Sequence, residues 1–186
     1  KHGLLGAFEN YSTDDFHKMR TGYYASIVLL DKQVGRVLDE LKSSGYEENT
    51  IVVFVSDHGD MLGDHNLLAE GVYFYDASFH VHLLIKYLDQ ITKGTKVSQV
   101  VQPHQIASTI LNLAGIDHDI NKDRQDLVEI AKHPYKIDQT NNFAVCEYRS
   151  TGICDKKTYW SPDINATMYF DGRFKLNIFH TEDFQG

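Results

Sequence analysis

The sequence predicts an α/β fold in a single domain of residues 1–186, and three observations carry that prediction. A long helical pattern spans residues 12–44, and an unbroken apolar run follows at residues 51–55 after a short polar turn. Helix, turn and strand in this order form half of a βαβ unit, which favours a doubly wound parallel sheet. Two later strand-like runs flank Asp171-Gly172, a dipeptide typical of hairpins, so we expect antiparallel strands at the C-terminal end.

The composition argues against several classes of protein. Hydrophobic residues make up 42% of the chain, which is typical of a folded globular domain rather than a disordered one. The formal net charge is −8 with scattered acidic residues, so we expect no nucleic-acid partner. No apolar run approaches the roughly 18 residues of a spanning helix, and we expect no membrane partner. Cys146 and Cys154 fit neither a metal motif nor a disulfide framework, and we expect ordinary thiols.

The first element is the helix over residues 12–44. Its apolar residues recur at steps of three and four over many turns, which is the pattern of an amphipathic helix. Ser12 is the expected N-cap, Asp15 occupies the capping-box position, and Gly45 fits the position after the helix end. We expect this helix to pack its apolar face on the sheet and to carry no functional site.

The remaining elements are placed by apolar runs and by glycine and proline. The run at residues 51–55 lacks polar alternation, which predicts a central parallel strand covered on both faces. Pro103 opens a helix that reaches Leu113 and ends at Gly115. Residues 116–142 are polar without a clear period, and we expect them to wrap the surface. The other expected elements are a short helix within 72–79 and strands at 81–87, 97–101, 143–148, 166–170 and 174–179.

The candidate chemistry lies directly after the apolar run of residues 51–55. Asp57 and His58 leave the carboxyl end of that strand, which is where ligands bind in open α/β sheets. A carboxylate beside an imidazole is a suitable pair for a divalent metal, although a complete site needs four to six ligands. Asp60, Asp64 and His65 are further candidates in the same loop. The alternative is a polar turn in which Asp57 or Asp60 accepts hydrogen bonds from backbone amides.

Three stretches of the chain resemble the sulfatase family of the alkaline phosphatase superfamily. The longest, residues 22–65, reads GYYASIVLLDKQVGRVLDELKSSGYEENTIVVFVSDHGDMLGDH, and PHQIASTILNLAGI and MYFDGRFKLNIFH follow at 103–116 and 168–180. The resemblance covers most of residues 17–180. It implies an alkaline-phosphatase-like three-layer sandwich, of which this chain is one part, from the second half of the catalytic domain.

The resemblance also implies roles for individual residues. Asp57 and His58 match family ligands of a divalent cation, usually calcium, with manganese and magnesium as alternatives. His65 matches a histidine of the same loop and is the candidate catalytic residue, in contact with the substrate or with a ligand residue. The implied reaction is hydrolysis of a small-molecule or carbohydrate sulfate ester by a formylglycine nucleophile.

The chain departs from the family pattern at several positions. Glu70 stands where the family usually has a lysine that reaches a sulfate oxygen, and His80-Val81-His82 stands where many relatives have Arg-Val-Pro. The family's nucleophile motif, Cys/Ser-x-Pro-x-Arg, is found at neither Cys146 nor Cys154. The formylglycine is therefore expected only in an N-terminal half that lies outside this sequence.

Two other functions remain open at this point. The chain is also compatible with a phosphonate monoester or phosphodiester hydrolase of the same superfamily, and with a non-catalytic truncated domain. We expect the isolated 186 residues to be inactive and to bind divalent cations poorly. A sheet edge left uncovered would favour association, so we also expect a homodimer.

Overall fold

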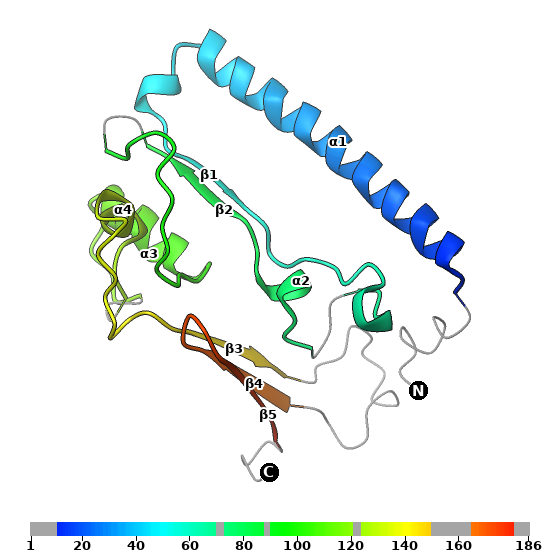
Figure 1. The fold of residues 1–186 in the computed structure, drawn as a ribbon. Helices are drawn as coiled ribbons and strands as arrows, with labels where there is room; N and C mark the ends of the chain where they lie inside the picture. Colours follow the sequence, from blue (N-terminus) through cyan, green and yellow to red (C-terminus); the bar gives the residue numbers. More distant parts are fainter. Residues whose placement is uncertain (1–10, 70–72, 88–89, 121–123, 150–164, 181–186) are drawn as a thin grey trace. The chain divides into compact units, whose positions relative to one another are not determined.

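The computed structural model describes residues 11–69, 73–87, 90–120, 124–149 and 165–180 (Figure 1). The chain divides into two compact units, the first Lys1–Val52 with His58–His82 and the second Val53–Asp57 with Leu83–Gly186. Each unit is described by itself below. Of the described helices, none is long and apolar enough to cross a membrane.

The first unit is dominated by the long helix α1 (Thr13–Ser43), whose predicted limits are confirmed. Ser12 and Asp15 form a complete capping box, in which the Asp15 N–H donates to Ser12 Oγ at 3.2 Å and the Ser12 N–H to Asp15 Oδ2 at 2.9 Å. This box satisfies amides that have no partner inside the helix. At the other end Gly45 has a φ of +76°, the conformation in which glycine commonly ends a helix.

The predicted packing of the apolar face of α1 on the sheet stays a prediction, because the helix and the sheet belong to different units. The helix contains no buried residue, and Leu30 and Val37 are 55% and 68% exposed. Its periodic pattern is correct because helical spacing is a local property.

The rest of the first unit is a short connection before strand β1 (Val52–Val55) and a long loop after it, and their described residues contain three short helical turns. They are η2 (Glu47–Asn49), η3 (Asp64–Asn66) and α2 (Asp76–Phe79). The short helix predicted within residues 72–79 is present in its second half, while residue 72 lies outside the described residues. Met61 and Phe74, at most 2% exposed, are the buried apolar side chains of this loop region.

The second unit opens with a two-stranded sheet, β1 (Val52–Val55) beside β2 (Leu83–Lys86). Both strands were predicted, and in β1 the side chains of Phe54 and Val55 are each 40% exposed. The strand predicted at residues 97–101 is absent from this described segment. There the Val100 N–H donates to the side chain of Asn142 at 2.8 Å, so this amide is not used in a strand ladder.

Helices α3 (Gln105–Leu113) and α4 (Leu127–Lys132) pack together in the second unit. α3 begins after Pro103 and ends before Gly115, as predicted. The prediction that residues 116–142 only wrap the surface is wrong, because they contain α4 and part of the core. Leu127, Val128 and Ile130 are at most 4% exposed, and the Leu127 N–H donates to Thr109 Oγ1 of α3 at 3.1 Å.

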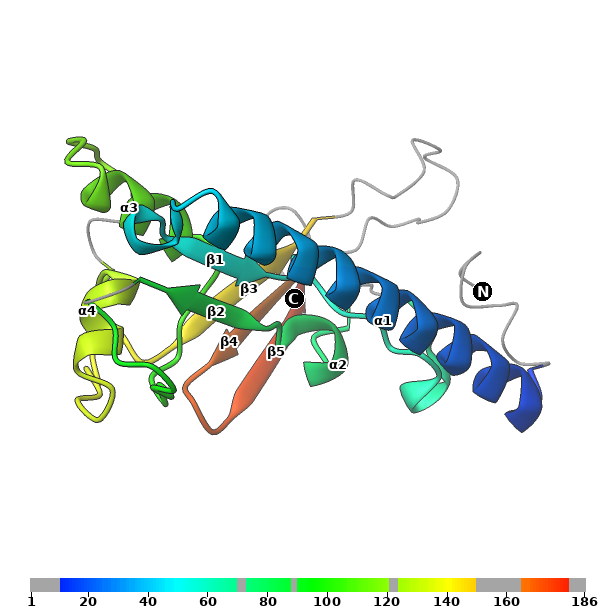
Figure 2. The same ribbon diagram turned by 90° about the horizontal axis from the view of Figure 1, so that it is seen from above.

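An antiparallel three-stranded sheet follows in the second unit, as predicted. Its strands β3 (Ala144–Tyr148), β4 (Asn165–Phe170) and β5 (Lys175–His180) lie side by side in that order (Figure 2). β4 is central, with Ala166 and Met168 buried. Asp171 and Gly172 form the predicted hairpin turn between β4 and β5, and Gly172 has a φ of +92°.

Candidate functional site

The loop that follows β1 carries the residues predicted to bind a metal. Asp57 is the last residue of the β1 segment in the second unit, and His58 opens the loop of the first. The chain then turns at Gly59, whose N–H donates to the carbonyl of Ser78, a residue of α2, at 2.9 Å. A Cβ at position 59 would lie 2.0 Å from the Ala77 carbonyl oxygen, so this close approach requires glycine.

The ring of His58 has a defined tautomer. Its Nδ1 lies 2.9 Å from the Gly59 carbonyl oxygen, and because a carbonyl only accepts, Nδ1 carries the proton. In the neutral ring the lone pair then belongs to Nε2. Histidines that bind metals typically donate their other ring N–H in this way, which fixes the ring and its tautomer.

The following segment, residues 61–68, is a tight loop with unusual backbone geometry. Leu62, His65 and Asn66 have φ values of +49°, +55° and +58°, and Gly63 has +96°. The Leu62 N–H donates to the Leu68 carbonyl at 2.9 Å and the Gly63 N–H to the Leu67 carbonyl at 2.7 Å. Left-handed conformations cost free energy for residues other than glycine and persist only where surrounding contacts maintain them.

His65, the candidate catalytic residue, lies against an aromatic ring. Its imidazole stacks on Tyr75 with the ring centroids 4.1 Å apart and the planes 12° from parallel. Asp64, a further candidate ligand, forms an ion pair with Arg20 of α1 at 3.1 Å. Tyr75 and Arg20 are site contacts that sequence reasoning missed, because each depends on a tertiary contact that no local pattern reports.

Asp57 and His58 suit a divalent cation in their donor chemistry but do not complete a site. A carboxylate is a ligand for hard cations, and the Nε2 of His58 is the ring nitrogen able to coordinate. Within the described ranges there is no group of three or more histidine, cysteine, aspartate or glutamate side chains that could hold a metal. The donor chemistry of Asp57 and His58 nevertheless fits a divalent metal.

The other residues singled out in the sequence lie elsewhere. His80 is the C-cap of α2, and His82 directly precedes β2. Glu70 and Cys154 lie outside the described residues. Cys146 is half-buried on β3, where burial raises the pKa of its thiol. A raised thiol pKa disfavours the nucleophilic thiolate, in keeping with an ordinary cysteine.

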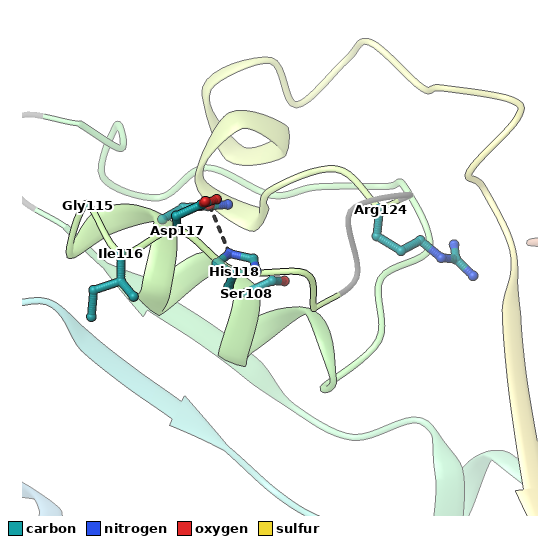
Figure 3. Close-up of a pocket in the computed structure, with 7 residues that line it drawn as sticks. Ser108, Gly115, Ile116, Asp117, His118 and Arg124 are labelled. Carbon is teal, nitrogen blue, oxygen red and sulfur yellow. Dashed lines mark hydrogen bonds between the residues drawn. The ribbon is translucent and has the colours of Figure 1, made fainter.

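A separate cavity of about 460 Å³ in the second unit is lined by residues of α3 and of the segment after it (Figure 3). The Ile120 N–H donates to Nδ1 of His118, whose Nε2 faces Asn112 Oδ1 at 3.0 Å, so both ring nitrogens have partners. Figure 3 shows Arg124 directed away from His118. The Arg124 guanidinium donates to the carbonyls of Asn141 and Phe143. These side chains maintain the fold and offer no reactive constellation.

Comparison with known proteins places these features in one family. A family model described as Sulfatase matches residues 2–116. An arylsulfatase of Clostridium perfringens is 39% identical over 162 residues, covering 83% of this chain and 34% of that protein. A multifunctional alkaline phosphatase superfamily protein of Trinickia caryophylli is 36% identical over 121 residues, covering 61% of this chain and 22% of that protein.

A solved structure supports the same fold. The crystal structure of a candidate sulfatase from Bacteroides thetaiotaomicron aligns with a TM-score of 0.75 and 23% identity, covering 91% of this chain and 35% of that one. The predicted alkaline-phosphatase-like α/β class with antiparallel strands is thereby confirmed. The chain spans about a third of the length of the arylsulfatase and of the solved structure.

Proposed function

The chain belongs to the sulfatase family, and from that premise we propose that it supplies part of the metal site of a sulfuric ester hydrolase. The observation that carries the proposal is the loop after β1. It places a carboxylate and an imidazole in consecutive positions, and the Nδ1 of His58 is tied to the Gly59 carbonyl at 2.9 Å. This is the arrangement in which His58 presents Nε2 as a ligand.

In the proposed site, Asp57 and His58 hold a divalent cation. Calcium is the ion we expect, with manganese and magnesium as alternatives. When bound, such a cation supplies Lewis-acid stabilisation to the oxygens of a transferring group. Asp57 contributes a negative charge that favours cation binding, and the Gly59 carbonyl keeps the His58 ring in the tautomer that coordinates.

His65 is proposed as the catalytic residue of this chain, in contact with the substrate or with a ligand residue. Its ring is restrained by stacking on Tyr75, and its backbone by the left-handed turn of residues 61–68. A side chain restrained in this way loses little conformational entropy when it engages a substrate.

The remaining parts of the active site are proposed to lie in polypeptide other than these 186 residues. A site with two ligands needs others to complete it, and the family's nucleophile motif is absent from residues 1–186. On this proposal residues 1–186 form one part of a larger catalytic domain, a formylglycine is contributed by another part, and the isolated chain is inactive. Glu70 would disfavour direct binding of a sulfate oxygen at its own position.

The proposed substrate is a small-molecule or carbohydrate sulfate ester. The test uses the longer polypeptide that contains these residues, with 4-nitrophenyl sulfate as the first substrate. Asp57→Asn should lower kcat/KM by on the order of 100-fold or more, since it removes a charged ligand. Asp39→Asn on the exposed surface of α1 is the matched control and should leave kcat/KM unchanged. Equal activity in both variants would contradict the proposal.

A second candidate function is hydrolysis of phosphonate monoesters or phosphodiesters. It is favoured by the 36% identity to the multifunctional alkaline phosphatase superfamily protein. A panel of sulfate esters, phosphate diesters and phosphonate monoesters decides between the two candidates through the ratios of kcat/KM. A preference for phosphodiesters would replace the sulfatase proposal, and a longer polypeptide inactive on every ester would favour a non-catalytic domain.

We also propose that the chain forms a homodimer, because exposed strand edges promote pairing between molecules. Sedimentation equilibrium of the purified chain tests this directly, and a monomeric mass across the concentration range would exclude it.

A further inference from the structure

The loop of residues 61–68, which carries His65, is held from the side by helix α1. The Arg20 Nε–H donates to the Leu62 carbonyl at 2.8 Å, and Arg20 Nη2 lies 3.1 Å from Asp64 Oδ1. The ring of Phe16, one helical turn before Arg20, occupies the space beside Gly63. A Cβ added to Gly63 would lie 2.6 Å from Cδ1 of Phe16. All of these residues belong to the first unit.

The contacts meet the loop at two adjacent residues with positive φ, of which Leu62 is the strained one because it is not glycine. Leu62, which accepts from Arg20, has a φ of +49°, and Gly63, which faces Phe16, has +96°. The backbone of Leu62 relaxes from this conformation unless neighbouring groups hold it. A guanidinium is suited to this task because its rigid fork donates to two acceptors at once, which the single ammonium of lysine does less well.

We propose that Arg20 is a positioning residue, which holds residues 61–68 in the left-handed turn that lays His65 on Tyr75. The proposal rests on the function proposed above in assigning His65 a role, but the geometry that it explains does not depend on catalysis. Arg20 acts through the loop and touches no reacting atom. The bond to the Leu62 carbonyl is the essential one, since the ion pair with Asp64 is exposed on both sides and such pairs contribute little.

The first experiment measures amide hydrogen exchange in the 186-residue chain by NMR. Arg20→Gln and Arg20→Lys should both speed exchange at Leu62 and Gly63 by about tenfold or more, the effect expected for a lost charge-assisted hydrogen bond. Asp64→Asn should change these rates by less than about threefold. Arg36→Gln is the matched control, because Arg36 lies on the same helix and bonds to Gln33 one turn away.

Exchange at Met168 in β4 serves as the reference for global unfolding, so that a general loss of stability is separated from opening of the loop. The NMR spectrum gives a second readout. In the two Arg20 variants the ring protons of His65 should lose the upfield shift caused by the stacked Tyr75 ring. Unchanged exchange at Leu62 and an unchanged His65 shift in Arg20→Lys would overturn the proposal. If Arg20→Gln does not fold, Arg20→Lys alone decides it.

The second experiment uses the longer polypeptide and 4-nitrophenyl sulfate. Arg20→Lys should lower kcat by about tenfold or more while Arg36→Lys leaves it unchanged. Loop opening without loss of kcat would overturn the positioning role. Absence of sulfatase activity in the unmodified polypeptide would instead count against the proposed function, and the exchange result would still decide whether Arg20 holds the loop.

Discussion

At the scale of single residues, Gly59 shows how a contact distant in sequence can require one amino acid. The Ala77 carbonyl lies where a Cβ would be, and the Gly59 N–H is bonded to Ser78 beside it. We predict that Gly59→Ala destabilises the chain by about 1–3 kcal/mol, because the loop must shift away from α2. Urea unfolding followed by circular dichroism measures this change.

Gly22 provides the control for that prediction. It lies inside α1 with nothing within 4 Å of the position that a Cβ would occupy, so Gly22→Ala should stabilise the helix by about 1 kcal/mol. A loss of unfolding free energy for Gly59→Ala together with a gain for Gly22→Ala would support the steric argument. A gain of unfolding free energy in both variants would show that the approach of Ala77 to Gly59 leaves room for a Cβ at position 59.

Asp171 gives a prediction about pH. The Phe174 N–H and the Arg173 N–H donate to its carboxylate at 2.6 and 2.8 Å, and these bonds hold the pKa of Asp171 below its ordinary value of 3.8. Between the lowered pKa and 3.8 the unfolded chain binds more protons than the folded one, so stability falls as the pH falls through this window.

The stabilising contribution of Asp171 is therefore fully present above about pH 4 and lost below its folded pKa. We predict that Asp171→Ala lowers the melting temperature at pH 6 and that the difference from the unmodified chain shrinks below pH 3.8. Asp171→Asn keeps an acceptor without the charge and should show the smaller loss. Thermal melts at several pH values check both variants. A melting-temperature difference between Asp171→Ala and the unmodified chain that does not change with pH would contradict the role given to the Asp171 carboxylate.

The sequence offers Asp57, His58 and His65 as candidates because acids and imidazoles after an apolar run form a local signal, and their roles stay predictions. It could not identify Arg20 or Tyr75. Arg20 lies 42 positions before Leu62, to which it donates, and resembles any other cation on a polar helix face. Stacking of Tyr75 on His65 likewise follows from the path of the loop. Contacts between distant segments leave no periodic pattern in the sequence. The contacts of Arg20 and Tyr75 could therefore be found only from the structure.

At the scale of elements, the predicted limits of α1 were accurate because a capping box and a following glycine are local signals. α4 was missed because its six residues are too few to establish a helical period. The strand expected at residues 97–101 was wrong for a related reason. An apolar run does not determine the backbone partner, and the Val100 N–H bonds to the Asn142 side chain instead.

The buried face of α4 can be tested by mutation. Ile130 is 3% exposed, so we predict that Ile130→Ala costs about 2–5 kcal/mol in the free energy of unfolding. Glu129→Ala at the adjacent, solvent-facing position removes a local hydrogen bond to Lys132 and should cost far less than Ile130→Ala. Chemical denaturation measures both values. A small loss at Ile130 would mean that α4 is not part of the core.

At the scale of the whole molecule, the class of fold was predictable because helical spacing, β-branched runs and a hairpin dipeptide agree with one another. The extent of burial was not predictable. The apolar stripe of α1 and the apolar run of β1 are typical of buried surfaces, yet Leu30 and Val37 of the helix and Phe54 of the strand are at least 40% exposed. A pattern of apolar residues indicates that a surface is buried, but it does not indicate which part of the protein covers that surface.

The proposed metal site at Asp57 and His58 also needs ligands beyond these two side chains. Calcium takes six to eight oxygen ligands, and Asp57 and His58 offer only part of any coordination shell. We predict that the purified 186-residue chain binds calcium or manganese with a dissociation constant weaker than about 1 mM, and that Asp57→Ala leaves its calorimetric isotherm unchanged. The longer polypeptide should bind far more tightly and lose that affinity on the same substitution. Micromolar binding by the isolated chain, abolished by Asp57→Ala, would mean that these residues complete a site on their own, and the division of the metal site between two parts of the polypeptide would have to be abandoned.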